Sequence, residues 1–159
     1  MARYDREIPP GGEGSITVRI NTKGYQGEIR KKARIFTNDP RKKVEVVDIK
    51  AFVKAPIYIS PRFAYIRGPA GQSLSRSVSV RAGEERSLTL EEAGFNLGGR
   101  VTYAIEEVEA GRFYRIRFTA IPGPPGDYRG VLRLKTNYPE RPQIVIPVIA
   151  RVRSEGRTR

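Results

Sequence analysis

The sequence predicts an all-β protein built as a β-sandwich. Apolar and polar residues alternate over short runs such as residues 15–20, where Ile16, Val18 and Ile20 share one face. Gly and Pro clusters separate these runs, and such clusters preset turns and interrupt hydrogen-bonded ladders. Almost no segment shows helical periodicity. Short strands between Gly/Pro turns are typical of Greek-key sandwiches.

Part of the sequence occurs twice. The stretch Thr37-Asn38-Asp39-Pro40 recurs as Thr136-Asn137-Tyr138-Pro139, at an offset of 136 − 37 = 99 residues. This offset is about the length of one small β-sandwich domain. We interpret both stretches as hairpin turns whose polar side chains satisfy backbone groups, rather than as a ligand loop. The other shared positions are Gly27, Ile35, Ala51 and Val53 in the first copy, and Gly126, Leu134, Ala150 and Val152 in the second.

The first copy contains three predicted strands, at residues 15–20, 28–36 and 44–53. In the second of them, Ile29, Ala33 and Ile35 point one way and the basic residues point the other. Lys31 falls on the apolar side, so we expect it near the end of the strand or at a bulge.

Residues 57–152 contain about seven predicted strands. The first four lie at residues 57–61, 63–66, 74–80 and 100–108. The last three, at residues 114–118, 128–134 and 144–152, match the three strands of the first copy. Between them, residues 88–90 could form a short strand, and Glu91, Glu92 and Ala93 a turn of helix. The prediction is therefore the C-terminal part of an Ig-like β-sandwich at residues 1–55, a complete Ig-like sandwich at 56–153, and a disordered tail at 154–159.

Three strands cannot close a sandwich, because they leave an open edge and half a core. We expect the first copy to be completed either by sequence upstream of it in a longer protein or by strand exchange with another chain.

The composition argues against an enzyme. The chain has no Cys and no His, so disulfides, thiol nucleophiles and imidazole acid-base chemistry are excluded, and zinc loses its usual ligands. Paired carboxylates occur at Glu84-Glu85 and Glu91-Glu92, and a cluster at Glu106, Glu107 and Glu109. Nothing in the sequence brings them together as glycoside hydrolysis requires, and they lack the spacing of a calcium loop, so we interpret them as solvated turn residues. We predict no catalytic residue, cofactor or metal.

Basic residues are the candidate site. Lys and Arg number 30 against 17 Asp and Glu, which gives a formal net charge of +13. Such a surface could track phosphates. We favour the interpretation that it is the solvated face of strands, where charges discourage edge pairing, because the aromatic residues fall mainly on inward positions. One predicted stripe comprises Arg30, Lys32 and Arg34, with Arg41, Lys42 and Lys43 beyond it, and a second comprises Arg115, Arg117, Arg129, Arg133 and Lys135.

The first copy also resembles a known family. The stretches Ile8-Pro-Pro-Gly-Gly-Glu-Gly-Ser-Ile, Asn21-Thr-Lys-Gly and Thr37-Asn38-Asp39-Pro40 resemble the C-terminal half of the bacterial Ig-like domain-of-unknown-function family 1573, over residues 8–53. Residues 57–152 look like the divergent second sandwich that often follows. The resemblance implies a fold similar to the ASH, major sperm protein and PapD-like sandwiches. The family's upstream half usually carries Cys-Gly-Cys and often lies behind a secretion signal or lipid anchor, neither of which occurs in this sequence.

These observations predict a non-enzymatic Ig-like structural or protein-interaction module from a larger bacterial protein. Its partner would be another protein or a neighbouring Ig-like module, and a dimer by strand exchange is a further alternative. The resemblance implies a periplasmic or cell-envelope location, whereas a native start at Met1 would imply the cytoplasm. No run of residues is long and apolar enough for a membrane helix. The alternative is a module that binds a polyanion or nucleic acid through its basic strand faces.

Overall fold

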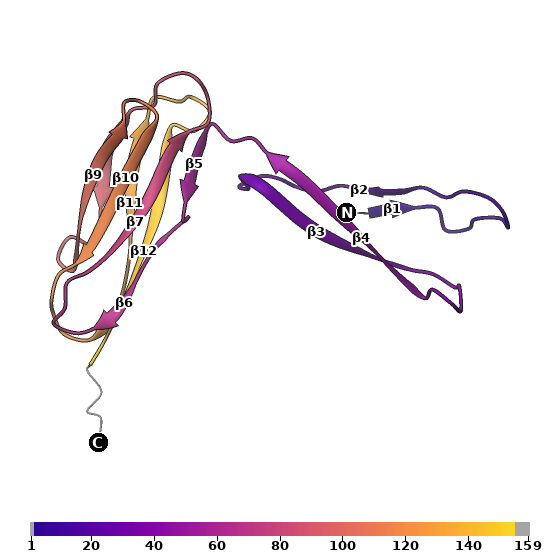
Figure 1. Ribbon diagram of the computed structural model, residues 1–159, viewed down its shortest axis with the longest axis horizontal. Coiled ribbons are helices and arrows are strands. Elements are labelled where there is room, and N and C mark those ends of the chain that lie inside the picture. Colours follow the sequence, from indigo (N-terminus) through magenta and orange to yellow (C-terminus); the bar gives the residue numbers. More distant parts are fainter. Residues whose placement is uncertain (1, 155–159) are drawn as a thin grey trace. The chain divides into compact units, whose positions relative to one another are not determined.

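The computed structural model describes residues 2–154, which form strands and connecting loops and no helix (Figure 1). The described part of the chain therefore has no helix that could span a membrane. The chain divides after Val53 into two compact units, called here the first and the second unit. The all-β prediction is confirmed. Of the predicted tail, Ser154 lies outside any strand, and residues 155–159 lie outside the described residues.

The second unit is a β-sandwich of two four-stranded sheets. One sheet has the order β5-β7-β10-β9 and the other the order β6-β12-β11-β8. Neighbouring strands are antiparallel except β6 and β12, which are parallel. Its strands are β5 (Ile57–Ser60), β6 (Ala64–Pro69), β7 (Leu74–Ala82), β8 (Leu90–Phe95), β9 (Val101–Glu109), β10 (Phe113–Ala120), β11 (Gly126–Thr136) and β12 (Gln143–Arg153).

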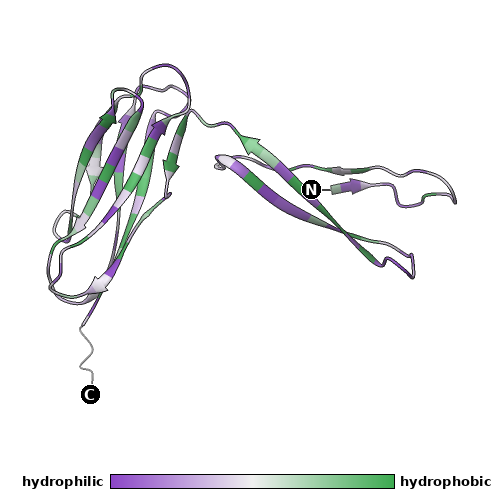
Figure 2. Ribbon diagram, viewed as in Figure 1, coloured by the Kyte–Doolittle hydropathy of each residue, from purple (hydrophilic) through white to green (hydrophobic). Residues whose placement is uncertain are grey.

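The alternation of the sequence explains why these strands pack as two layers. In β11, Leu132 and Leu134 are fully buried, whereas Arg133 and Lys135 between and after them are exposed. Figure 2 shows the same alternation as green and purple bands along the strands of the second unit. Each large apolar side chain removed from water contributes about 1.5–3 kcal/mol. The largest fully buried side chains are Tyr138, Phe118, Ile57, Ile66, Leu88, Ile116, Leu132, Leu134, Ile144 and Ile146.

The helical turn predicted at residues 91–93 is wrong. These residues lie in β8, where Glu91 pairs with Lys135 and Glu92 with Leu134 of β11. The register then shifts, and Gly94 takes a φ of +140°, which a glycine adopts more readily than other residues. Pairing with a distant strand decided the conformation against the local helix-forming tendency of the two glutamates.

The first unit contains four described strands in two ribbons (Figure 1). They are β1 (Ala2–Tyr4), β2 (Ile16–Val18), β3 (Gly27–Phe36) and β4 (Val44–Val53), paired as β1-β2 and β3-β4. The predicted set of three strands missed β1, whose three residues are too few to show a period of two. Its pairing is fixed from outside the strand, because the Asp5 carboxylate accepts a bond from the Ser15 backbone N–H at 2.8 Å.

The bulge expected near Lys31 is absent from the described pairing. β3 and β4 pair without a shift from Gly27 opposite Val53 to Phe36 opposite Val44. Lys31 therefore lies in the middle of the ribbon opposite Ile49, and its amine contacts the Tyr25 hydroxyl at 3.0 Å. The polar end of this long side chain is satisfied locally, so the strand does not need to bulge.

Candidate functional site

The two units share strands and turns in the same order. β2, β3 and β4 correspond to β10, β11 and β12, at offsets of 98 for the first and 99 for the other two. Even the turns match: the Thr37 hydroxyl donates to the Lys42 carbonyl at 2.6 Å, and Thr136 donates to the Arg141 carbonyl at 2.6 Å. The same hydroxyls accept from the backbone N–H two residues later, both at 3.1 Å. The interpretation of the repeat as a hairpin turn agrees with these bonds.

The first unit lacks the neighbours that these strands have in the second unit. There, β10 lies between β7 and β9, β11 between β12 and β8, and β12 between β11 and β6. Among the described residues 2–53 of the first unit, β2 pairs with β1 alone, and β3 and β4 pair with each other alone. The edges where β6, β7 and β8 would pair are open within the described residues. We call β2, β3 and β4 with these edges the open half-sandwich.

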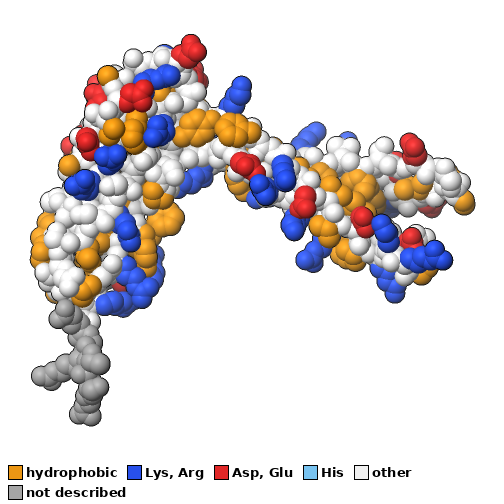
Figure 3. Space-filling model, viewed as in Figure 1, with side chains coloured by type: hydrophobic (Ala, Val, Ile, Leu, Met, Phe, Trp, Pro, Cys, Tyr) orange, Lys and Arg blue, Asp and Glu red, His pale blue; other side chains and the backbone are white. Residues whose placement is uncertain are grey.

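Side chains that form the core in the second unit are exposed in the open half-sandwich. Val18 is 39% exposed and its counterpart Ile116 is 0% exposed. Val47 is 42% exposed, whereas its counterpart Ile146 is 0% exposed. Ile29 is the one large apolar side chain that is buried among the described residues of the first unit. Figure 3 shows apolar side chains between Lys and Arg on the surface of this unit. Exposed apolar side chains at positions that form a core elsewhere in the chain are candidates for an interaction site.

The first predicted basic stripe lies on the other face of the β3-β4 ribbon. Arg30, Lys32 and Arg34 alternate with Ile29, Lys31, Ala33 and Ile35 along β3, and all three are exposed. A surface depression here is lined by Arg30, Lys32, Asp48 and Lys50. Part of the positive charge is neutralised, since Arg30 pairs with Glu28 at 2.7 Å and Lys32 with Asp48 at 3.8 Å.

The remaining basic candidates of the first unit lie in the turn between β3 and β4. Arg41, Lys42 and Lys43 are all exposed, and Lys42 pairs with Glu45 at 3.6 Å. The structure thus places them at the end of the ribbon that carries the first stripe. They extend the stripe along the chain but belong to the turn rather than to the strand face.

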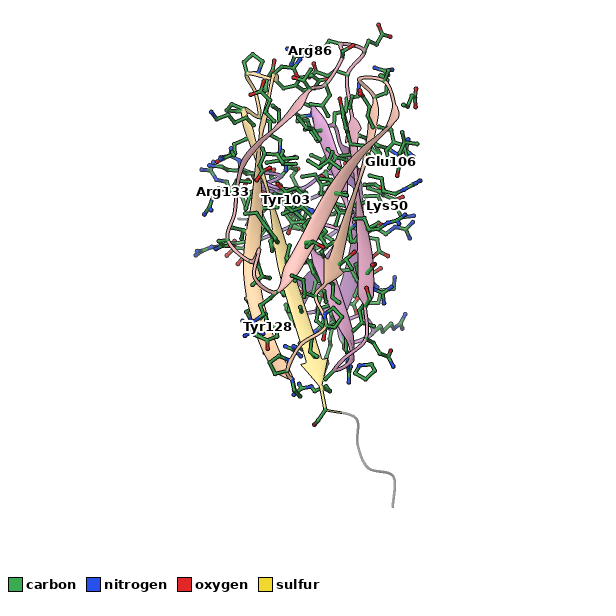
Figure 4. The ribbon with its side chains drawn as sticks, turned by 90° about the vertical axis from the view of Figure 1, so that its left-hand side faces the viewer. Lys50, Arg86, Tyr103, Glu106, Tyr128 and Arg133 are labelled. Atoms are coloured by element: carbon green, nitrogen blue, oxygen red, sulfur yellow. The ribbon has the colours of Figure 1, made fainter. Side chains whose placement is uncertain are left out.

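The second predicted stripe is not one surface. Arg115 and Arg117 lie on β10 in one sheet, whereas Arg129, Arg133 and Lys135 lie on β11 in the other. Both sets alternate with buried or partly buried residues, so they point away from the core on opposite sides of the sandwich. Figure 4 shows Arg133 and Glu106, the partner of Arg115 at 3.3 Å, on opposite sides. The sequence could not assign these strands to sheets, so the prediction placed all five residues in one stripe.

A polar contact that sequence reasoning missed holds the crossover from β7 to β8. The Asn137 side chain accepts from the Thr89 backbone N–H at 2.9 Å and donates to the Ser87 carbonyl at 2.9 Å. Leu88, between these two residues, is fully buried. Asn137 therefore fixes the backbone on both sides of an apolar anchor. The repeated Asn was visible in the sequence, but its partner lies about fifty residues away.

The carboxylates of Glu106 and Glu107 are each bound by neighbouring groups. Glu106 faces Arg115, while the Glu107 carboxylate accepts from the Gly111 backbone N–H at 2.6 Å and from the Tyr114 hydroxyl at 2.9 Å. The Gly111 bond, and after it the Tyr114 bond, holds the pKa of Glu107 below its usual value. A carboxylate held ionised in this way suits a structural role. Within residues 2–154, no group of three or more acidic, His or Cys side chains could hold a metal ion.

Comparison with known proteins adds no assignment: no family model matches the chain, and no curated protein matches it.

Proposed function

We propose that the protein is a non-enzymatic Ig-like structural or protein-interaction module of a larger bacterial, envelope-associated protein, and that the open half-sandwich is its binding surface. The resemblance of residues 8–53 to domain-of-unknown-function family 1573 supports the family and the location. The exposure of apolar side chains such as Val18 and Val47 in the first unit is the observation that supports the binding surface.

The mechanism is β-augmentation. A strand that pairs with an open edge gains main-chain hydrogen bonds, and its alternate side chains cover the apolar face beneath it. β2 offers such an edge, and β3 and β4 offer one each. The partner is another protein or a neighbouring Ig-like module. Exposed edges left unpaired invite aggregation, so a partner also protects the module itself.

Photo-crosslinking in native cells tests this function. A photoreactive benzoylphenylalanine replaces Val18 at the open half-sandwich, and a matched variant carries it at Val145, which is 45% exposed on the outer face of the second unit. We expect a crosslinked protein from the Val18 variant and none from the Val145 variant. Equal crosslinking at both positions, or none at Val18, would refute the proposed surface. An immunoblot of cell fractions from the same culture reports the envelope location and whether the band exceeds 17.9 kDa.

A second candidate function, the binding of an anionic polymer or nucleic acid, is favoured by one observation. Arg30 and Arg34 recur at the offset of 99 as Arg129 and Arg133, and all four are exposed on outer strand faces. The cross-strand neighbours recur as well, because Arg34 pairs with Val46 and Arg133 with Val145. The ion pairs of Arg30 and Lys32 weaken this surface.

A salt titration separates the two functions. The affinity for an oligonucleotide should fall steeply as the salt concentration rises, because each neutralised phosphate releases counterions. Strand addition should depend little on salt and should fail when a Pro is placed on the open edge of β2. An oligonucleotide affinity that is absent or insensitive to salt would eliminate the second candidate.

A further inference from the structure

The crossover between β7 and β8 has no counterpart among the described residues of the first unit. In the second unit, residues 83–89 pass from one sheet to the other beside the Thr136 turn, which holds them through Asn137. The first unit repeats this turn with the same Thr37 bonds, and Asn38 stands at the position of Asn137. Within residues 2–154, the Asn38 side-chain amide is exposed and makes no hydrogen bond. It is free to hold a polypeptide backbone as Asn137 does.

The charge beside this amide is reversed between the two units. Glu140 of the second unit bonds the guanidinium of Arg86, which lies on the crossover. At the offset of 99, Arg41 occupies the position of Glu140. The guanidinium of Arg41 forms no ion pair with another described residue. A polypeptide that followed the path of the crossover would place one residue opposite Arg41, at the position of Arg86 in the second unit. An acidic residue there would complement the charge of Arg41.

We propose that the open half-sandwich docks a partner polypeptide in the place that β7, the crossover and β8 hold in the second unit. Its crossover carries an acidic residue opposite Arg41, followed two residues later by an apolar anchor whose flanking backbone groups bond to Asn38. This proposal rests on the proposed interaction function and names its partner. The partner's first strand pairs with the open edge of β2 and its second with that of β3.

The proposed interface repeats one that the same chain already contains. Ile116 pairs with Val78 of β7, and Leu134 with Glu92 of β8. The counterparts of Ile116 and Leu134 in the first unit are Val18 and Ile35, at the positions that would face the partner's two strands. A second copy of the chain is a poorer occupant, because its β7 and β8 are already paired and its own turn brings further positive charge.

The docked segment of the partner ends with the strand that takes the place of β8. In the second unit, the chain after β8 passes over Gly130, where an added Cβ would meet the Asn96 side-chain oxygen at 2.6 Å and the Leu97 Cβ at 2.9 Å. Lys31 stands at the equivalent position in the first unit, so β3 carries a long side chain there, and its amine lies 3.0 Å from the Tyr25 hydroxyl. The partner therefore has no equivalent of Asn96 and Leu97 packed over β3.

Two synthetic peptides test the proposal. One spans Leu74–Phe95 of this chain, and the other carries Arg86→Glu, the predicted acidic residue. Each is titrated into the isotopically labelled full chain at low salt. The side-chain amide signal of Asn38 and the methyl signals of Val18 report docking, and the Asn137 amide reports any exchange in the second unit. We expect the Arg86→Glu peptide to bind at least about threefold more tightly than the native peptide.

Variants of the full chain make the test specific. Asn38→Ala should weaken the binding of both peptides by about threefold or more. Arg41→Glu should reverse their order of affinity. Lys50→Glu, which makes the same charge change on the outer face of β4, should leave that order unchanged.

Four results would overturn the proposal: no movement of the Asn38 and Val18 signals, equal affinity for the two peptides, an order that Arg41→Glu does not reverse, or self-association of the chain that covers Val18 without peptide. The last result would identify a second copy as the occupant. Crosslinking at Val18 in cells would still support the interaction function if the peptides failed, so the two proposals fail separately.

Discussion

Tyr138 and Arg86 contact each other in two ways. The Tyr138 hydroxyl donates to the Arg86 backbone carbonyl at 2.6 Å, and the Arg86 guanidinium lies 4.1 Å from the centre of the Tyr138 ring. Tyr138 is the largest fully buried side chain of the described residues. The second copy of the repeated turn is therefore anchored by its ring as well as by Asn137. The first copy has Asp39 at this position and lacks the anchor.

Removing only the Tyr138 hydroxyl should have a moderate effect. Tyr138→Phe loses the bond to the Arg86 carbonyl and should lower the free energy of unfolding of the second unit by about 1 kcal/mol. Tyr138→Ala also loses the buried ring and should cost about 3–5 kcal/mol. Urea denaturation of the full chain measures both changes. Equal effects of the two substitutions would contradict the anchoring role of the ring.

Asn137 and Asn38 should respond differently to the same substitution. Asn137→Ala leaves the Ser87 carbonyl and the Thr89 N–H without their partner and should destabilise the second unit by about 1 kcal/mol, because both groups can reach water. Asn38→Ala is the matched control and should change the stability of the chain alone by less than about 0.5 kcal/mol. Hydrogen exchange of the Thr89 amide checks the first effect. A large effect of Asn38→Ala would show that its amide already has a partner.

Stability should fall at alkaline pH because of Tyr114, which is buried, and Tyr103, which is partly buried. Burial, and after it the bond to Glu107, raises the pKa of Tyr114 from 10.0 to about 12. Its contribution to stability is thus complete below pH 10 and is lost as the pH rises through about 12, since the unfolded chain ionises first. Burial, and after it Glu92, likewise raises the pKa of Tyr103 to about 12.

An ultraviolet titration of the phenolates checks this prediction. Tyr114→Phe should remove one late-ionising phenol and make the alkaline loss of stability shallower. An unchanged titration curve in the Tyr114→Phe chain would contradict the assignment.

Gly130 should not tolerate a side chain. Its added Cβ would meet the Asn96 oxygen at 2.6 Å, and this oxygen accepts from the Val131 backbone N–H at 2.7 Å. Gly130→Ala should therefore destabilise the second unit by about 1–3 kcal/mol. Gly98→Ala is the control, because nothing lies within 4 Å of a Cβ there. Thermal unfolding compares the two variants, and equal melting temperatures would contradict the predicted clash.

Local pattern predicted most of the strands but not their neighbours. The alternation placed β4 at its observed bounds and put Leu132 and Leu134 inside, because period two is a property of consecutive residues. The pattern failed where distant pairing decided the outcome. β1 has only three residues, too few to show a period, and the glutamates of β8 favour helix. Both segments nevertheless form strands, because β1 pairs with β2 and β8 pairs with β11.

The candidate site was predicted in the same uneven way. The sequence identified the exposed basic residues of single strands. It wrongly placed Arg115 and Arg133 in one stripe, although their strands belong to different sheets. The contact of Asn137 with Ser87 was missed, because residues fifty positions apart show no pairing signal in one sequence.

The sequence by itself determined that the chain is all-β, that Thr37-Asn38 and Thr136-Asn137 match at an offset of 99, and that Cys and His are absent. These follow from residue types and spacing, which need no partner. Only the tertiary structure decided which strands share a sheet, and that the same apolar positions are buried at Ile116 but open at Val18. The physical reason is that a side chain is buried only where two surfaces pack against each other. The second unit contains both surfaces, whereas the described residues of the first unit contain one of them.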